Sequence, residues 1–402
     1  MRSPKPTLGR LFSALVLPLC LGVLSLSLAP RPSRADASSD SLSEVLHSAA
    51  EEILKVVKDQ AVSVGQITPT GLPDANGGPA IVELLKQELE RLRPGSVRRA
   101  GAFEIKGDFN LAPHSDPSEA GLGQKVVRLL FRIVDTATGE ENNLRLTRFL
   151  RDNTTIARVL GVSGPLPLDP AKDQRDQRRE RNKAIQENLQ NPKAFIDQKN
   201  PSRISSTSDS PYQVEILAGP LGDGKARPTE PRAARIEEGL GFVDVKRGEA
   251  YEVRIYNRSR EEVAVRLFID SLDMFHFSDD RDPKDPTRPK FAYLILPPGT
   301  NESPSVQEIA GWHKSIKGKE NFLAFLVTEY GKGAASSQGI PASGPIGVIQ
   351  VQFSRCHPDL PGGRKRSAGN ETGKGPPREV GQTEVTREVE PPIDVVSVRY
   401  TR

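Results

Sequence analysis

The chain has 402 residues, with 56 basic and 52 acidic side chains and a formal net charge of +4. Charges that balance this closely produce no strong field, which argues against nucleic acid or an anionic lipid surface as a partner. Glycine and proline number 34 each and hydrophobic residues make up 36%, a composition typical of loop-rich chains with β structure rather than of helix bundles.

The N-terminus has the three parts of a secretory signal peptide in the usual order. Basic residues precede an apolar run that small residues follow: Arg2, Lys5 and Arg10, then 11–28, then 35–37. This order predicts a leader at residues 1–37, cleaved from a protein that is periplasmic or secreted. An uncleaved leader would be a membrane anchor, and no other membrane contact is predicted. Lipid attachment at Cys20 is disfavoured, because Leu17-Pro18-Leu19 lacks the small residue that normally precedes such a cysteine.

Removal of the leader leaves about 365 residues, enough for two domains at roughly 100–200 residues each. Cys356 is then the only cysteine, so no disulfide can form within the chain and stability must come from packing. A covered, unreactive thiol is favoured over a reactive one, because thiol reactivity requires a special environment.

The first predicted domain, residues 41–165, mixes helices and strands. Ser41 and Glu44 form a capping box, after which apolar residues recur at helical spacing. The predicted helices span 41–58, 79–92 and 152–160, and the predicted strands span 61–67, 103–111, 127–133 and 144–149. Residues 135–140 read as a turn that joins the last two strands in a β-hairpin. The order of elements indicates an α/β domain with a mixed sheet.

Residues 166–208 are predicted to be a charged helical linker. Its most basic part carries Arg175, Arg178, Arg179 and Arg181. A partner-binding arm is one interpretation of this stretch. A solvated linker is favoured, because acidic and amide residues interleave with the arginines.

From residue 210 to 402 the apolar period becomes two, which predicts a β-sandwich. The predicted strands span 212–216, 251–255, 263–269, 291–296, 306–312, 322–327, 346–353 and 395–400. Residues 257–261 are expected to join two of these strands as a hairpin, and a loop at about 357–390 is expected to be disordered. The last strand is expected to return to the sheet. The fold class is therefore α+β: an N-terminal α/β domain with a mixed sheet, then a C-terminal antiparallel β-sandwich.

The hairpin of the first domain carries Val134-Asp135-Thr136-Ala137-Thr138-Gly139-Glu140 and follows the glycine-containing strand at 103–111. This arrangement resembles the periplasmic family that includes penicillin-binding-protein activators, flagellar outer-membrane accessory proteins and the curli secretion channel. The resemblance implies an accessory or assembly role in the cell envelope, without catalysis.

The second domain resembles an uncharacterised bacterial secreted β-sandwich module. The resemblance rests on four phrases in order, at 248–257, 268–272, 293–299 and 309–312, and on the closing strand at 395–400. It implies a sandwich that is attached to various secreted proteins, and it implies no particular chemistry.

A near match to a phosphate-binding loop follows the strand at 212–218. Gly219-Pro220-Leu221-Gly222-Asp223-Gly224-Lys225 has the glycines and the lysine, but Ala226 stands where the magnesium-binding hydroxyl is needed. Pro228 and Pro231 oppose the helix that must follow. Nucleotide binding is therefore not expected.

Acidic residues crowd one loop of the second domain: Asp270, Asp273, Asp279, Asp280, Asp282 and Asp285. Asp279, Asp280 and Asp282 are weak candidates for calcium, an ion that takes about 6–8 oxygen ligands. The twelve-residue spacing of a calcium loop is missing, and Arg281, Lys284 and Arg288 can neutralise the acids. A solvated acidic loop is favoured, and no metal or cofactor is predicted.

The remaining candidates are single residues. The five histidines at 47, 114, 276, 313 and 357 have no metal-ligand spacing. Trp312 with the adjacent His313 is a weak candidate for binding a partner, although a tryptophan at a strand end more often fills a core.

The sequence therefore predicts a non-catalytic secreted or periplasmic protein, an envelope-associated assembly or binding factor whose partner is an envelope protein or a glycan. The alternative is a secreted hydrolase whose site is assembled from dispersed residues around Asp270–Asp285 and His276.

Overall fold

The computed structural model describes residues 37–220, 230–316, 321–327, 347–358 and 384–400. Residues Ala35–Arg402 form one compact unit. The fold is α+β, with a helix-covered mixed sheet followed by a β-sandwich, as the sequence predicted. The leader predicted at 1–37 lies outside the described residues except for Ala37. Within those residues, no helix is both long and apolar enough to cross a membrane.

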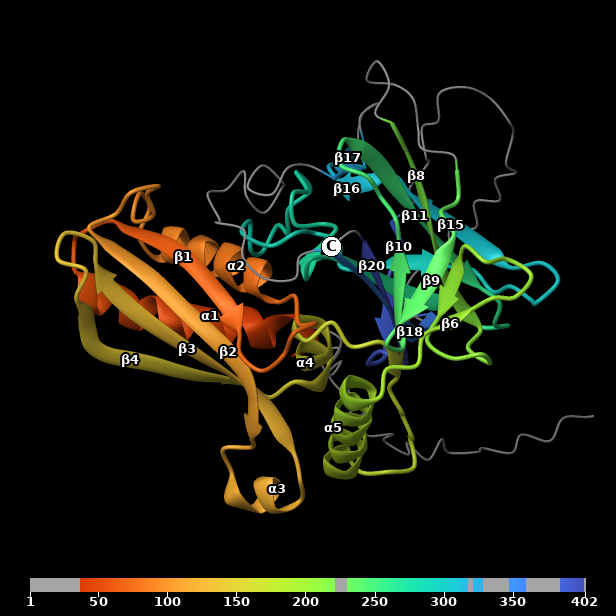
Figure 1. The fold of residues 1–402 in the computed structure, drawn as a ribbon, viewed down its shortest axis with the longest axis horizontal. Coiled ribbons are helices and arrows are strands. Elements are labelled where there is room, and N and C mark those ends of the chain that lie inside the picture. The colour runs from red at the N-terminus through yellow and green to blue at the C-terminus, as the bar shows by residue number, and fades with distance from the viewer. Residues whose placement is uncertain (1–36, 221–229, 317–320, 328–346, 359–383, 401–402) are drawn as a thin grey trace, which may run out of the picture. The chain divides into compact units, whose positions relative to one another are not determined.

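The N-terminal part is a four-stranded sheet in the order β1-β2-β3-β4, with α1 and α2 along one face (Figure 1). Its strands are β1 (Val62–Pro69), β2 (Phe103–Pro113), β3 (Lys125–Asp135) and β4 (Glu141–Leu150), and its helices are α1 (Ala37–Val57), α2 (Gly78–Leu92), α3 (Pro117–Gly121) and α4 (Asn153–Val159). The pair β1–β2 is parallel and the other two pairs are antiparallel, so the predicted mixed sheet is confirmed. Helix α1 begins four residues before the predicted cap, and α3 was not predicted.

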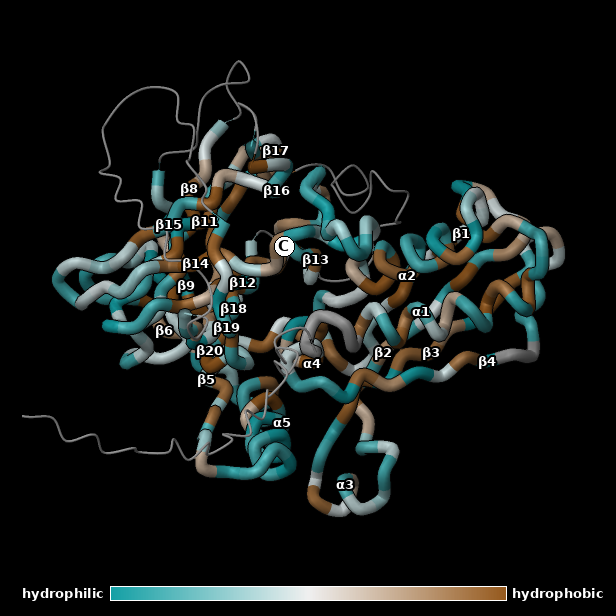
Figure 2. The backbone as a smooth tube through the Cα atoms, turned by 180° about the vertical axis from the view of Figure 1, so that it is seen from behind, coloured by the Kyte–Doolittle hydropathy of each residue, from teal (hydrophilic) through white to brown (hydrophobic). Residues whose placement is uncertain are grey.

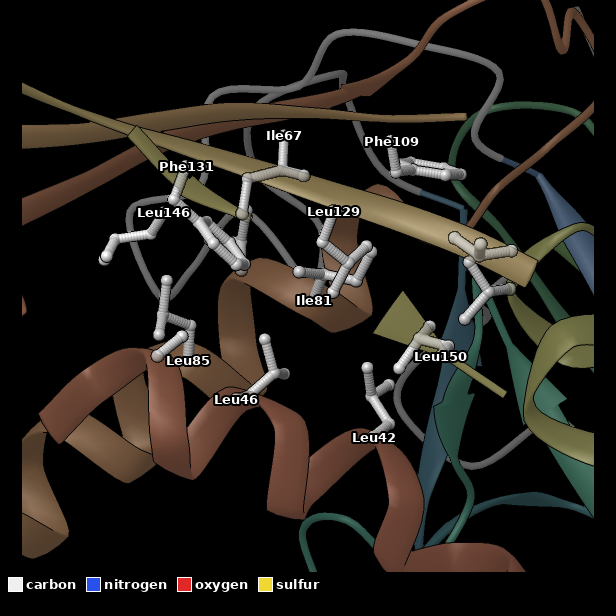
Figure 3. Packing of buried hydrophobic residues seen from close by; sticks show 14 of the residues in the cluster. Leu42, Leu46, Ile67, Ile81, Leu85, Phe109, Leu129, Phe131, Leu146 and Leu150 are labelled. Carbon is white, nitrogen blue, oxygen red and sulfur yellow. The ribbon is translucent and has the colours of Figure 1, made fainter. Parts of the chain in front are cut away.

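One hydrophobic core holds these helices on the sheet. Figure 3 shows Leu42 and Leu46 of α1 and Leu85 of α2 directed at Phe131 and other residues of the strands. All four side chains are fully buried. Burying apolar surface of this kind contributes about 25 cal/mol per Å², which explains why the period-3.6 helices pack on the period-2 strands.

The hairpin between β3 and β4 is confirmed. The side chain of Asp135 accepts hydrogen bonds from the backbone nitrogens of Ala137 at 2.8 Å and Thr138 at 3.0 Å. Gly139 has φ of +74°, a left-handed conformation that glycine adopts without the steric cost of a side chain. The turn chemistry in the sequence therefore fixed this connection locally.

Helix α5 (Gln174–Gln190) is the predicted charged helix, but it is not the fully solvated linker that was favoured. Most of it is hydrophilic (Figure 2), yet Arg181, Asn182 and Ile185 are buried. Nη1 of Arg181 donates to the carbonyl of Pro392 at 2.8 Å, and Ile185 belongs to the N-terminal core. Short polar contacts of this kind cannot be recognised from composition, because they depend on segments distant in the sequence.

The C-terminal part has two sheets. Among the described residues, nine strands form one sheet: β13 (Leu272–Asp273), β12 (Val263–Ile269), β18 (Val348–Pro358), β20 (Asp394–Tyr400), β10 (Leu240–Val243) and β9 (Ala234–Glu237), with β14 (Leu294–Leu296), β19 (Arg387–Val389) and β5 (Gly164–Pro165) at its sides. Seven form the other: β16 (Gly311–His313), β17 (Phe322–Leu326), β11 (Glu249–Asn257), β8 (Tyr212–Pro220), β7 (Arg203–Ser205) and β6 (Phe195–Ile196), with β15 (Ser305–Ile309) beside β11. All pairs are antiparallel except β10–β20. The sandwich thus recruits β5, β6 and β7, which precede its predicted start at residue 210.

The terminal strand returns to the sandwich as predicted. Strand β20 pairs with β18 over Val348↔Arg399 to Phe353↔Asp394. Its apolar side chains and those of β8, β11 and β12 form a second core between the sheets. A chain end that pairs on both sides is held by backbone hydrogen bonds along its length.

The expected hairpin at 257–261 is wrong. Strand β11 lies in the seven-stranded sheet and β12 in the nine-stranded sheet, so this segment crosses the sandwich. Asn257 has no exposed surface and holds the crossing: its amide nitrogen donates to the carbonyls of Glu261 and Pro297, both at 2.8 Å. An apolar period of two occurs both in strands that pair within one sheet and in strands that face each other across a sandwich. The sequence pattern therefore could not distinguish a hairpin from a crossing at 257–261.

The loop at 357–390 is also corrected where it is described. Strand β18 extends to Pro358, and β19 pairs with it through Cys356↔Val389 and Pro358↔Arg387. Residues 359–383 lie outside the described residues. The strand predicted at 306–312 is divided at Ala310 into β15 and β16, which pair with different neighbours.

The face of β18 and β20 that points away from the sandwich core is polar and still buried. Nε2 of Gln350 donates to the carbonyls of Ala157 at 3.2 Å and Val162 at 3.1 Å. The hydroxyl of Ser397 donates to the same Val162 carbonyl at 2.9 Å. The segment after α4 therefore covers this face through hydrogen bonds, and the two predicted domains share one interface.

Candidate functional site

One cavity has a volume of about 630 Å³ and lies between α2 and the segment 266–292. Helix α2 supplies one wall and the loop at 281–292 supplies another. The wall residues used below are Leu84, Gln87, Glu88, Glu90, Arg91, Arg158, Arg266, Ser271, Leu272, Asp273, His276, Arg281, Asp282, Asp285, Thr287, Arg288, Lys290 and Phe291. The volume falls within the range of about 300–1,000 Å³ that is common for small-molecule sites.

Arg158 enters the cavity wall from α4. Asp152 caps this helix by accepting a hydrogen bond from the Thr155 backbone nitrogen at 2.7 Å, and Arg158 sits in the last turn. Its side chain is 7% exposed, and its Nε and Nη2 have no hydrogen-bond partner. Burial, with a smaller contribution from the charge of Arg266, lowers the pKa of the Arg158 guanidinium to about 10. It remains charged at neutral pH.

Arg266 reaches the same wall from β12. Its Nε and Nη2 donate to one carboxylate oxygen of Asp273, at 3.3 and 2.7 Å. The ring of Phe268 lies beside both guanidinium groups, at 4.9 Å from Arg266 and 5.1 Å from Arg158. An aromatic face stabilises a nearby cation by about 0.5–2 kcal/mol. The Nε and Nη2 edge of Arg266 therefore has a carboxylate partner, whereas the same edge of Arg158 has none.

A strained turn places Asp273 opposite Arg266. Asp270 and Ser271 join β12 to β13 with φ of +51° and +64°, conformations that cost about 1–3 kcal/mol each in residues other than glycine. Asp270 accepts hydrogen bonds from the backbone nitrogens of Gly347 at 2.7 Å and Val348 at 3.0 Å. The hydroxyl of Ser271 donates to the carbonyl of Arg158 at 3.1 Å. The turn is thus held from both sides and links the two arginines.

His276 is held by α2. Its Nε2 lies 3.5 Å from Oε1 of Glu83 and 3.1 Å from the amide nitrogen of Gln87. His276 is 8% exposed and Glu83 is 5% exposed. A histidine beside a buried carboxylate can serve as a proton carrier, but both partners here also join α2 to the sandwich, which is a structural role.

Asp280, Asp282 and Asp285 of the acidic loop each have a partner within the protein. Asp280 accepts hydrogen bonds from the Ser315 hydroxyl at 3.2 Å and the Ile316 backbone nitrogen at 2.7 Å. Asp282 accepts from the Lys284 backbone nitrogen at 2.8 Å, and Asp285 forms an ion pair with Arg288 at 3.2 Å.

The calcium candidates are not brought together. In the described part of the chain, no three histidine, cysteine, aspartate or glutamate side chains are placed to hold a metal ion. Asp279, Asp280 and Asp282 therefore form no such group.

Trp312 and His313 lie in the sandwich core. Trp312 is 7% exposed and packs edge-on against Phe277 at 5.1 Å and Phe325 at 5.4 Å. His313 has no exposed surface, and its Nδ1 is 3.1 Å from the hydroxyl of Ser278. A partner cannot reach either side chain, so the weak binding prediction is corrected to a packing role. Burial equally removes the Ser278–His313 pair from contact with a substrate.

The other single-residue candidates lie apart from the cavity, except His47. His47 pairs with Glu88 at 3.0 Å on the α1–α2 face, and Glu88 lines the cavity rim. His357 pairs with Glu390 at 3.2 Å on the edge of the sandwich. Of the glycine-rich stretch at 219–225, only Gly219 and Pro220 are among the described residues.

Sequence reasoning found part of this site and missed its cations. His276, Asp273 and the acidic loop were identified as one region. Arg266 stood within the apolar strand Val263-Ala264-Val265-Arg266-Leu267-Phe268-Ile269, and a charge inside an otherwise buried strand was the signal that could have identified it. Arg158 offered no comparable signal, because short helices often end on a basic residue.

Comparison with known proteins gives no relative from which a role could be transferred: no protein-family model, no curated protein and no solved structure matches this chain.

Proposed function

We propose that this chain is an exported, non-catalytic binding protein of the bacterial cell envelope, and that it holds a ligand, or a group of a partner, in the cavity between α2 and 266–292. The observation that carries the proposal is the cavity itself: about 630 Å³, with a buried cationic wall and apolar patches at Leu84, Leu272 and Phe291. Pockets of this size are typical of ligand recognition.

The titratable groups of the cavity support binding over catalysis. The Asp273 carboxylate accepts a hydrogen bond from Arg266, and Nε2 of His276 lies against Glu83 and Gln87. Ser271 lines the cavity, but its hydroxyl donates to a backbone carbonyl. Nucleophilic catalysis needs a hydroxyl or thiol within reach of a base, and the Ser271 hydroxyl is not placed against one. The Thr287 hydroxyl does donate to Asp285 on the cavity wall, but the Asp285 carboxylate is also paired with Arg288, which weakens it as a base.

A secreted hydrolase remains the second candidate, because His276, Asp282 and Asp285 do line one cavity. A broad panel of ester, glycoside, phosphate and peptide substrates separates the two functions. The binding proposal expects no turnover above that of a His276→Ala variant. Turnover that is lost in His276→Ala and in Asp282→Asn would establish the hydrolase instead.

Export is supported by the leader and is tested separately. N-terminal sequencing of protein recovered from the periplasm or medium should begin close to residue 38. Affinity purification from that compartment should also recover an envelope protein or glycan. Full-length protein confined to the cytosol would overturn the localisation, and recovery of the exported protein alone would argue against an assembly role.

A further inference from the structure

Arg158 differs from several other arginines because the Nε and Nη2 edge of its guanidinium group has no hydrogen-bond partner. That edge presents two parallel N–H groups and suits a carboxylate. Other arginines in the described part of the chain direct it at a carboxylate: Arg91 at Glu88, Arg254 at Glu308, Arg266 at Asp273 and Arg387 at Glu262. In Arg158 both nitrogens of this edge are buried and have no hydrogen-bond partner.

The positive charge of Arg158 is also poorly balanced. The carboxylate of Asp273, on the same cavity wall, is already bonded to Arg266. Asp152 lies in the same region, but burial raises its pKa and it is used to cap α4. A buried charge without a close partner is destabilising, so an anion placed here would be stabilised.

We infer that the cavity binds an organic monocarboxylate, and that Arg158 recognises its carboxylate group. This inference rests on the proposed binding function and specifies its ligand. The cavity is much larger than a simple ion requires, and Leu84, Leu272 and Phe291 offer apolar surface for the rest of the ligand.

Glu88, Glu90, Asp282 and Asp285 line the same space together with Arg91, Arg281, Arg288 and Lys290. Glu88 is paired with Arg91 and Asp285 with Arg288, so these outer charges balance in number and give no strong net field. The buried edge of Arg158 is therefore the group that selects the ligand, and its two N–H groups fit one carboxylate. The unpartnered edge of Arg158 has almost no exposed surface, so the ligand must shift this side chain or the 281–292 wall on entry.

The test uses benzoate and hexanoate as probes, with benzamide and hexanamide as neutral controls of the same shape. Binding is measured by isothermal titration calorimetry and by the melting temperature at constant ionic strength. Wild-type protein should bind at least one of the two carboxylates and neither amide. Arg158→Met should abolish binding while keeping the melting temperature without probe equal or higher, because it removes the unbalanced charge.

Two further variants keep the test decisive. Arg158→Lys keeps the charge but loses the two-nitrogen edge, and should bind at least tenfold more weakly. Arg260→Met removes an exposed arginine outside the cavity and should bind within twofold of wild type.

The failures of the two proposals can be told apart. If the amides bind as well as the carboxylates, or if Arg158→Met binds the carboxylates normally, the cavity is a binding site and the anion inference is wrong. If none of the four probes binds, the inference is wrong; substrate turnover dependent on His276 would then overturn the proposed binding function as well.

Discussion

Replacing Gln350 by leucine should uncouple the sandwich from the helix-covered sheet. Gln350 is 1% exposed, and its amide nitrogen donates to the carbonyls of Ala157 and Val162. Its amide oxygen accepts from Gln352 at 3.2 Å. Each lost hydrogen bond costs about 0.5–1.5 kcal/mol, and leaving the Gln352 amide without an acceptor costs about 1–3 kcal/mol. The extra apolar burial of leucine offsets part of this, so we expect a loss of about 2–4 kcal/mol in the free energy of unfolding.

The single tryptophan makes this loss measurable in each part. Trp312 reports the sandwich core by fluorescence, whereas far-ultraviolet circular dichroism at the helical band reports mainly α1, α2, α4 and α5. In urea, the two signals of wild-type protein should change together, because the interface couples the parts. In Gln350→Leu both midpoints should fall, and the two transitions should separate.

A matched control is Gln307→Leu. Gln307 lies in β15, away from the interface, and its amide donates only to the neighbouring carbonyl of Glu308, so its effect should stay within about 0.5 kcal/mol. Coupling through Gln350 is refuted if the two transitions of wild-type protein are already separate, or if Gln350→Leu is no less stable than the control.

Three other predictions concern single groups. Burial raises the pKa of the Cys356 thiol to about 12, so a thiol reagent at pH 8 should modify native protein at least a hundredfold more slowly than urea-unfolded protein; equal rates would show an accessible thiolate. Burial also raises the pKa of Asp394, so its neutral form favours the fold below about pH 3.9, and that stability is lost as pH rises through the folded value. Urea titrations from pH 4 to pH 7 should therefore favour Asp394→Asn increasingly over wild type, by about 1.4 kcal/mol for each pKa unit between the folded and unfolded values, and a constant difference would contradict this. Finally, millimolar calcium should leave the melting temperature unchanged, because the carboxylates of Asp280 and Asp285 already have partners in the protein. A rise of several degrees would show that the protein binds calcium and would contradict this prediction.

The candidate site could be predicted only in part. The crowding of acids around His276 was visible because those residues are close in sequence. The partners that give them their roles come from far away: Glu83 and Gln87 from α2, and Arg158 from α4. Which acid neutralises which arginine depends on distances of a few ångströms, and no spacing in the chain encodes them.

The sequence by itself determined the local elements. Apolar spacing of 3.6 and 2 located α1, α2 and the long strands, Asp135 and Gly139 specified the first hairpin, and the apolar end of the chain predicted β20. These features depend on interactions between neighbouring residues, which a linear pattern records directly.

Only the tertiary structure decided how those elements are combined. It placed β11 and β12 in different sheets, covered the polar face of β18 and β20 with the segment after α4, and set Arg158 against the cavity. In each case, several surfaces of similar polarity compete for the same neighbour. The native arrangement is the one that gives hydrogen-bond partners to the buried polar groups of distant segments.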